Sequence, residues 1–325
     1  MTTRERIKAV LNGRKPDRQP MVEWASWWDK TIKRWEGEGL PAGLNQWELF
    51  NYFGLDKFRQ RWVSPRRRAC PDLSGIILDG KNYDELKEYL YPYDYIPAVI
   101  DEIKAENEAY DKGEFAFWYT IEGFFWFPRT LFGIERHLFA FYDCPKLYHR
   151  ICRDLTDFNK ALIEGINSVS SPEFMTFAED MSYNLGPMLS KDFFYEFIAP
   201  YYRELIPSIK KAGTKVFVDT DGDVTSMLPW LQSAGVEGVL PLERQAGVDI
   251  NKIKFEHPAL LMLGGFDKTV MHKGDKAIRA EFERLRPAVS AGGYIMSVDH
   301  QTPPEVSLED YRLYLEIYKE YACLI

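Results

Sequence analysis

Lys215-Val-Phe-Val-Asp-Thr-Asp-Gly222 is the stretch that decides the fold, because an apolar run ends there in two acids and a glycine. The pattern predicts a buried strand that leaves the core for a loop at its carboxyl end. Side chains two residues apart on a strand point to the same face, so Asp219 and Asp221 are expected to aim in one direction. A later run of the same kind, Gly292-Gly-Tyr-Ile-Met-Ser-Val-Asp-His300, ends in a lone histidine.

Strand and helix patterns alternate on both sides of this stretch. Strands are predicted at 21–25, 115–121, 174–178, 216–218, 235–241, 259–263 and 294–297, with an eighth near Ile76–Leu78. Helices are predicted between them, among them 145–166, one from Ser190 to about 212, and a last one capped by Ser307. Such alternation implies parallel strands joined by right-handed crossovers.

The fold expected from this order is α/β, a single (β/α)8 TIM-type barrel over residues 1–325. Residues 26–115 would form an N-terminal elaboration over the barrel mouth. The alternative is an open doubly wound sheet, whose usual G-x-G-x-x-G fingerprint after the first strand is missing.

Composition excludes several classes of function. The net charge of −8 argues against a nucleic-acid partner, which would need a positive surface. No apolar run approaches the roughly 20 residues that cross a bilayer, so no membrane partner is expected. The charged N-terminus is no signal peptide, and four widely spaced cysteines indicate neither a disulfide scaffold nor a thiolate metal site. We therefore expect a cytoplasmic protein.

Polar residues follow nearly every predicted strand. They are Glu23, Glu122, Glu179 with Asp180, Asp219 with Asp221, Glu243, Asp267 with Lys268, and Asp299 with His300. In a barrel all of them would open onto the C-terminal rim, where barrel active sites lie. Each alone is also explained by the frequency of acids in turns. Together, so many carboxylates must bind a cation, share protons or be held apart.

Asp219, Asp221 and His300 form the most specific subset. Two carboxylates and a neutral imidazole would balance a divalent cation and leave a position open for substrate, as in catalytic zinc sites. Glu243 is a possible fourth ligand. Equally, the two acids could cap the next helix at Thr225 while His300 forms a hydrogen bond in the core. Spacing alone leaves both interpretations open.

Aromatic residues are dense just after the first two strands, where Trp24, Trp27 and Phe125 could form the walls of a flat pocket. Glu23 and Glu122 would be further substrate contacts, and an ordinary packed core is the alternative for the aromatic residues. The arginines at 59, 61 and 66–68 could bind phosphates or propionates, or lie in a solvated loop.

Several motifs, taken in order, resemble the uroporphyrinogen decarboxylase superfamily. They are Arg4-Glu-Arg-Ile-Lys-Ala-Val-Leu-Asn-Gly13, Pro16-Asp-Arg-Gln-Pro20, Gly186-Pro-Met-Leu-Ser190 with Phe194, Phe197 and Pro200-Tyr201, the Asp221-Gly222 turn, Gly264-Gly-Phe-Asp267, Gly292-Gly-Tyr-Ile295, and Thr302-Pro-Pro304 with Glu309-Asp-Tyr311. The resemblance covers almost the whole chain and is weakest from 26 to 115. It implies a single β/α barrel, in agreement with the strand pattern.

The resemblance also implies a choice between two chemistries. Decarboxylases of the superfamily carry an N-terminal Arg-Gln-Ala-Gly-Arg segment that binds substrate propionates. Here the corresponding stretch, Glu23-Trp-Ala-Ser-Trp-Trp-Asp29, has no arginine, which argues against porphyrinogen decarboxylation. The methyltransferases of the superfamily work with corrinoid proteins and bind zinc through His-x-Cys at a strand end and a late Cys. These ligand positions fall on Asp219-x-Asp221 and His300.

From this we expect a methyltransferase that demethylates a small methylated substrate of the methoxy-aromatic class and transfers the methyl group to the corrinoid (cobamide) of a partner protein. Asp219, Asp221 and His300 would hold a divalent metal, with zinc expected. This harder donor set favours an oxygen ligand, so O-demethylation fits it. Glu243, as a fourth ligand or a base, would belong to the catalytic group together with Glu179 and Asp180, which would support the ligands or contact substrate.

Two other functions remain open at this point. One is a decarboxylase that needs no metal, in which Asp219 and Asp221 share a proton and one acts as general acid. The other is a non-catalytic protein that binds a flat aromatic ligand or a corrinoid.

Overall fold

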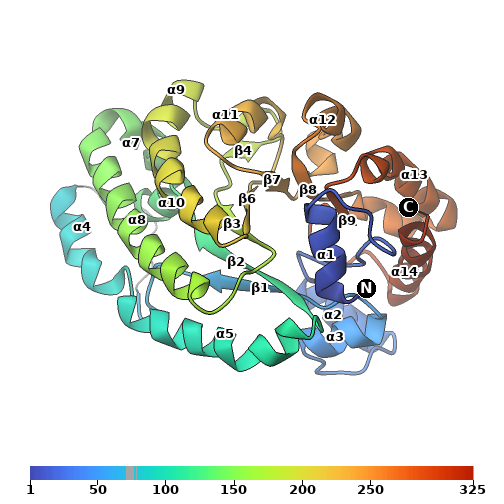
Figure 1. The fold of residues 1–325 in the computed structure, drawn as a ribbon. Helices are drawn as coiled ribbons and strands as arrows, with labels where there is room; N and C mark the ends of the chain where they lie inside the picture. Colours follow the sequence, from blue (N-terminus) through green and yellow to red (C-terminus); the bar gives the residue numbers. More distant parts are fainter. Residues whose placement is uncertain (71–76, 78, 325) are drawn as a thin grey trace. The chain divides into compact units, whose positions relative to one another are not determined.

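The computed structural model describes residues 1–70, 77 and 79–324, and Figure 1 shows its helices and strands along the chain. The chain forms two compact units. The terminal unit comprises Met1–Gln60, Ala109–Phe117 and Gly238–Ile325, and the central unit comprises Arg61–Glu108 and Trp118–Glu237. A single barrel domain over 1–325 stays a prediction.

Parallel strands form the buried layer of the central unit. They are β2 (Ala116–Glu122), β3 (Phe174–Ala178) and β6 (Lys215–Asp219). Glu122 pairs with Ala178, and Ala178 pairs with Asp219, so the three strands end at one level. β2 and β3 are buried along their whole length, as parallel strands covered on both faces are. β4 (Ser182–Tyr183) and β5 (Gly186–Pro187) follow β3 as a small antiparallel hairpin.

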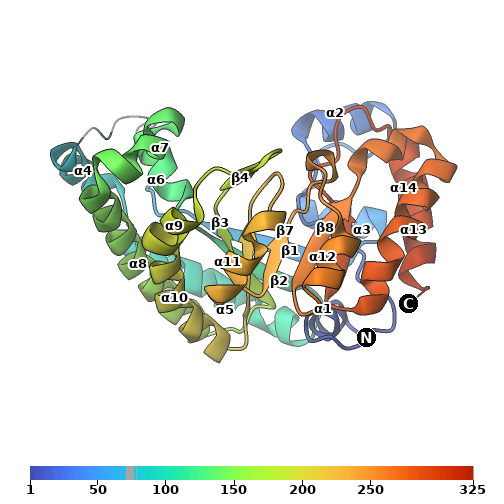
Figure 2. The ribbon, with the colours of Figure 1, turned by 90° about the horizontal axis from the view of Figure 1, so that it is seen from above.

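Helices α8 (Pro145–Asn167) and α10 (Ala199–Lys211) lie side by side in the central unit (Figure 2). The buried face of α8 includes Ile151, Leu155, Leu162 and Ile166, at helical spacing. The other helices that lie in or begin in this unit are α4 (Gly80–Leu86), α5 (Ile96–Asp111), α6 (Trp126–Phe132), α7 (Ile134–Asp143), α9 (Lys191–Phe193) and α11 (Leu228–Ser233), with short 3-10 or π turns at Lys87–Tyr89, Tyr93–Tyr95, Phe194–Ile198 and Thr225–Met227.

The terminal unit has its own run of buried parallel strands, β7 (Gly238–Leu240), β8 (Leu261–Phe266) and β9 (Tyr294–Val298). A Cβ at Gly264 would lie 2.1 Å from the carbonyl oxygen of Pro241, so β8 tolerates no side chain there. Its helices are α1 (Thr3–Leu11), α2 (Asp29–Gly37), α3 (Gln46–Phe53), α12 (Ile250–Glu256), α13 (Asp275–Ala291) and α14 (Leu308–Ala322), with 3-10 turns at Arg244–Ala246 and Lys268–Lys273.

Helix starts agree with the sequence signals. Thr2 and Glu5 form a capping box on α1, and Ser307 and Asp310 form one on α14. The Ser190 hydroxyl accepts a hydrogen bond from the backbone N–H of Phe193, at the start of the helical segment that ends with α10. The predicted positions of the helices that begin at Ser190 and Ser307 are confirmed.

Two strand predictions differ from the structure. Residues 21–25 form no strand. The Asp56 backbone N–H donates a hydrogen bond to the Met21 carbonyl, and the Ser297 hydroxyl donates one to the Val22 carbonyl, so single hydrogen bonds and no strand ladder hold the segment. A strand that was not predicted, β1 (Phe58–Val63), lies within residues 26–115, the predicted N-terminal elaboration. Its sequence, Phe-Arg-Gln-Arg-Trp-Val, has three polar residues in a row, so it lacks the alternation of apolar and polar residues that indicates a half-buried strand.

The α/β class is confirmed, whereas closure into an eight-stranded barrel stays a prediction. The strand expected near Ile76–Leu78 falls partly outside the described residues, which exclude Ile76 and Leu78. Within the described part of the chain, no helix is both long and apolar enough to span a bilayer. All four cysteines are free.

Candidate functional site

Five carboxylates gather at the carboxyl ends of the central-unit strands. Glu122 ends β2, Glu179 and Asp180 follow β3, Asp219 ends β6, and Asp221 comes two residues later. We call these five residues the acid edge. The strand register places Glu122 and Asp219 at the level of Ala178, directly before Glu179 and Asp180. The sequence reasoning that strand-end acids collect at one edge therefore holds within this unit.

The aspartates of the acid edge repel one another. Burial raises the pKa of the Asp219 carboxyl well above its usual range, and the charges of Asp180 and Asp221 raise it further. The Asp219 carbonyl accepts hydrogen bonds from the backbone N–H groups of Glu179, at 2.9 Å, and Asp180, at 3.4 Å. Asp180 also has a positive φ of 41°, a strained conformation for a residue with a side chain. Such a cluster can take up a proton or a cation.

A rigid turn positions Asp221. The Thr220 hydroxyl accepts hydrogen bonds from the Met181 and Ser182 backbone N–H groups at 2.9 and 3.1 Å, and the Ser182 hydroxyl donates to the Asp221 carbonyl at 2.6 Å. Gly222 follows with a φ of +79°, and a Cβ there would lie 2.4 Å from the Tyr183 backbone. The turn after β6 is thus fixed against the β4–β5 hairpin, and Gly222 is required for it.

Glu179 holds the loop between β2 and α6. Its two carboxylate oxygens accept hydrogen bonds from the backbone N–H groups of 124–126 at 2.7–3.1 Å, and Oε1 also accepts one from the Tyr202 hydroxyl at 2.6 Å. A Cβ at Gly123 would lie 2.1 Å from this carboxyl group. Burial raises the pKa of Glu179 to about 7, against the opposing effect of these donors. The contacts favour a positioning role, and the predicted catalytic role stays a prediction.

Glu122 is buried and ion-paired. Its Oε1 accepts hydrogen bonds from the Ser64 hydroxyl and the Arg66 guanidinium, each at 3.0 Å. Phe125, predicted as a substrate contact, is fully buried with its ring 4.4 Å from that of His137 in a T-shaped arrangement. The substrate-binding predictions for Glu122 and Phe125 stay predictions, and the structure gives both residues contacts inside the protein.

The predicted aromatic contacts of the terminal unit also lie in its core. Trp24 donates its indole N–H to the Val298 carbonyl at 2.8 Å, and Trp27 packs against Phe53 and Tyr311. Glu23 is completely buried and accepts a hydrogen bond from the Tyr311 hydroxyl at 3.1 Å. Burial raises the pKa of Glu23 to about 8.

His300 follows β9 in the terminal unit, where its Nδ1 accepts a hydrogen bond from the Gln301 backbone N–H at 2.9 Å. The proton of the neutral ring then lies on Nε2. To bind a metal through Nε2, the ring must move this proton to Nδ1, and Nδ1 then loses the hydrogen bond from Gln301. Glu243 follows β7 in the same unit and directly precedes a 3-10 turn. Both residues are partly buried.

A buried ion pair beside His300 was not assigned a role by the sequence reasoning. Lys268 Nζ lies 3.0 Å from Asp299, which also accepts a hydrogen bond from the Arg244 backbone N–H. Burial raises the pKa of Asp299, and the charge of Lys268 opposes that effect. The sequence indicated that Lys268 and Asp299 each follow a strand. Their pairing depends on the register of β8 and β9, which the sequence does not show.

The predicted metal set is divided between the two units, with Asp219 and Asp221 in one and His300 in the other. Across residues 1–70, 77 and 79–324, no group of three or more His, Cys, Asp or Glu side chains is arranged to hold a metal ion. The ligand set, Glu243 included, therefore stays a prediction.

The family model for uroporphyrinogen decarboxylase (URO-D) matches residues 64–321. Comparison with curated protein sequences gives no match. Among solved structures, a methyltransferase from Methanosarcina mazei is similar, with 16% sequence identity, a TM-score of 0.66 and coverage of 99% of both chains.

Two further solved structures are less similar. A protein assigned as a vitamin-B12-independent methionine synthase from Listeria monocytogenes has 13% identity and a TM-score of 0.44, covering 93% of this chain and 95% of its own. The 3-keto-D-glucoside 4-epimerase YcjR from E. coli has 12% identity and a TM-score of 0.43, covering 81% of this chain and 100% of its own. At such identities the structural likeness concerns the fold alone. The family match, by contrast, spans most of the sequence, and the chain belongs to the uroporphyrinogen decarboxylase family.

Proposed function

We propose that this protein is a metal-dependent methyltransferase that removes the methyl group from a small methoxy-aromatic compound and passes it to a corrinoid protein. The observation that carries the proposal is the crowding of Asp180 and Asp221 around the buried Asp219, whose pKa is raised first by burial and further by these two charges. Family membership and the fold shared with the Methanosarcina mazei methyltransferase support it. Trp24, Trp27 and Phe125 are core residues and give no evidence for an aromatic pocket. The methoxy-aromatic class is therefore proposed from the oxygen-rich donor set.

The donor chemistry fits a hard divalent cation. Carboxylate oxygens suit such an ion, and a positive charge beside Asp219 would offset the repulsion from its neighbours. We assign Asp219 and Asp221 as ligands, His300 as the third, and Glu243 as a fourth ligand or a base. The cation, zinc in the simplest case, would draw electron density from the ether oxygen of the substrate.

The proposed reaction breaks the bond between the ether oxygen and the methyl carbon. The methyl group would leave without the bonding electrons, and a nucleophilic corrinoid held by the partner protein would accept it. The phenolate keeps the electron pair and takes up a proton, a step we assign to Asp180. Glu179 acts indirectly, because its carboxylate fixes the backbone of the loop after β2.

The raised pKa of Asp219 also favours a second candidate, a metal-independent decarboxylase. A carboxyl group whose raised pKa favours its protonated form can act as a general acid toward the carbanion left by loss of carbon dioxide. The absence of arginine from Glu23–Asp29 argues against porphyrinogen substrates for such an enzyme.

Metal analysis and a methyl-transfer assay separate the two candidates. The purified chain is expected to retain about one divalent ion, and Asp219→Asn, Asp221→Asn and His300→Gln are each expected to lower this below about half an ion per chain. Asp223→Asn is the matched control, because this nearby carboxylate caps the Thr225 N–H at 2.9 Å and an amide oxygen can do the same.

The activity measurement uses a reduced corrinoid protein and a panel of methoxylated aromatic compounds, with corrinoid methylation followed by absorbance. We expect the ligand variants to lose at least about 100-fold in rate while Asp223→Asn keeps wild-type activity. No methylation across the panel by the metal-loaded protein would remove the methyltransferase. Decarboxylation by a protein with less than about half an ion per chain would establish the second candidate.

A further inference from the structure

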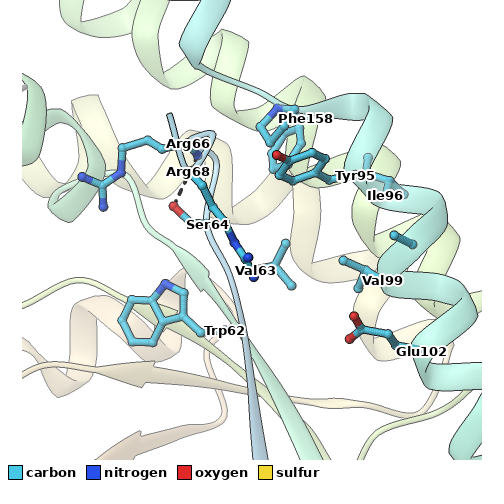
Figure 3. A pocket seen from close by; sticks show the side chains of 12 residues that line it. Trp62, Val63, Ser64, Arg66, Arg68, Tyr95, Ile96, Val99, Glu102 and Phe158 are labelled. Atoms are coloured by element: carbon cyan, nitrogen blue, oxygen red, sulfur yellow. Dashed lines mark hydrogen bonds between the residues drawn. The ribbon is translucent and has the colours of Figure 1, made fainter. Parts of the chain in front are cut away.

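A cavity of about 520 Å³ lies in the central unit, and the acids that the proposed reaction uses are not among the residues that line it. The end of β1 and the loop after it form one side, the first turns of α5 form the facing side, and Phe158 of α8 completes the wall (Figure 3). This volume is in the range that accommodates a small organic molecule.

Part of the cavity wall consists of apolar and aromatic side chains. Trp62 and Tyr95 are exposed over 47% and 43% of their surfaces, unusual for large aromatic side chains. Ile96 and Val99 project from α5 beside Tyr95, and Figure 3 shows them facing the strand side of the cavity. A ring placed here would cover apolar surface that water otherwise covers.

The loop after β1 carries three consecutive arginines, two of which are fixed by ion pairs. Arg66 pairs with the buried Glu122. Arg67 forms a bidentate pair with Asp94 at 2.6 and 2.9 Å, and its backbone N–H donates to the Tyr89 carbonyl. These bonds hold the loop on both sides of the backbone that presents Arg68.

Arg68 supplies the uncompensated charge of the cavity. It lines the wall, is exposed, and has no hydrogen bond or ion pair to any other described residue. Arg66 is neutralised by Glu122, and the acid in the wall, Glu102, is paired with Arg61 at 3.3 Å. Among the described residues of the wall, Arg68 is thus the one arginine without an ion pair, and a single positive charge beside an acidic neighbour suits a monoanion better than a doubly charged phosphate.

We propose that this cavity binds a small planar aromatic carboxylate. Its ring packs against Trp62 and Tyr95, and its carboxylate pairs with the Arg68 guanidinium. Guanidinium and carboxylate match in geometry and charge, which gives the site a preference over neutral rings of the same shape. The site is independent of the proposed methyl transfer, because none of its lining residues is assigned to that reaction.

Binding is tested with benzoate by isothermal titration calorimetry on the full chain, without added metal or corrinoid. Benzoate is expected to bind at least about tenfold more tightly than benzamide, which lacks the charge, and than acetate or inorganic phosphate, which lack the ring. Benzamide binding equal to benzoate overturns the anion recognition. Phosphate or acetate binding equal to benzoate overturns the aromatic class, and no heat from millimolar benzoate overturns the site.

Variants locate the binding. Arg68→Gln is expected to weaken benzoate about tenfold, Arg68→Lys to recover part of the loss, and Trp62→Leu to weaken it severalfold. Arg203→Gln is the matched control, since Arg203 is an exposed central-unit arginine stacked on Tyr195. Arg68 and Trp62 are exposed, so both variants should fold, which thermal melting verifies. Wild-type affinity in Arg68→Gln would refute the proposal.

Discussion

Replacing Glu23 with glutamine should stabilise the protein at alkaline pH and leave its stability unchanged in mild acid. Glu23 is completely buried, and its Oε1 accepts hydrogen bonds from the hydroxyl groups of Tyr311 and Tyr314 at 3.1 and 3.5 Å. Its Oε2 has no hydrogen-bond partner among the described residues. Because burial raises the pKa of Glu23 to about 8, against the lowering effect of the two tyrosines, the side chain is neutral at pH 7.

The sign of the pH dependence follows from proton binding. Between pH 4.5 and 8 the unfolded chain has released the proton of Glu23 while the folded chain retains it, so the free energy of unfolding falls as the pH rises. The fall is about 1.4 kcal/mol per pH unit, up to roughly 5 kcal/mol above pH 8. Below pH 4.5 both states are protonated and the contribution is fully present. A neutral amide of the same shape shows no such loss.

The measurement is urea unfolding of the wild type and Glu23→Gln at pH 5, 6.5 and 8. The stability difference between the two proteins should grow with pH in favour of the variant. Glu309→Gln, which changes an exposed glutamate of α14, is the control and should follow the wild type at every pH. A difference between wild type and Glu23→Gln that stays constant from pH 5 to 8 would refute a neutral buried carboxyl at this position.

Two further substitutions test how the acids are positioned. Gly222→Ala should lower the free energy of unfolding by about 3 kcal/mol, because a positive φ is combined there with a clash against the β4 backbone at 2.4 Å. Gly213→Ala is the control and should cost only about 1 kcal/mol, since φ is +87° and nothing lies within 4 Å. Equal losses of stability in melting experiments would contradict this reasoning. Asp56→Asn should lower the free energy of unfolding, measured in urea, by roughly 3 kcal/mol, because Asp56 pairs with the guanidinium groups of Arg6 and Arg18 at 2.8 and 2.7 Å. A decrease below about 1 kcal/mol would show that these ion pairs contribute little to stability.

The regular elements could be predicted where local chemistry decides them. Thr2 and Ser307 cap their helices by bonds to residues three positions away, so the sequence contains the whole motif. β6 could be predicted because a buried parallel strand is a continuous apolar run. β1 could not, because its side chains are mostly half-buried and its polar residues break the pattern. Residues 21–25 resemble a strand in composition, yet isolated hydrogen bonds from Asp56 and Ser297, and no ladder, hold them.

The acids of the site show the same division. Their place at strand ends could be predicted, since parallel strands bring their carboxyl ends to one edge. Their partners could not. Glu179 is bound by backbone groups more than 50 residues earlier in the chain and by a tyrosine 23 residues later, and Glu23 by a tyrosine 288 residues later. No periodicity relates such positions, and only the packed structure distinguishes an acid that holds a loop from one available to a substrate.

The acid edge can be divided on physical grounds into acids that stabilise the fold and acids that oppose it. Glu122 and Glu179 accept hydrogen bonds from neighbouring donors, so their carboxyl groups hold β2 and its following loop in place. Asp219 instead faces the charges of Asp180 and Asp221, and the turn at Gly222 prevents the group from relaxing apart. Repulsion maintained by a rigid turn costs folding free energy, and residues that oppose folding in this way are concentrated at functional sites. A cation or a shared proton would relieve the same repulsion. The three aspartates therefore destabilise the fold when no ligand is bound, and the same crowding favours the binding of a cation or a proton.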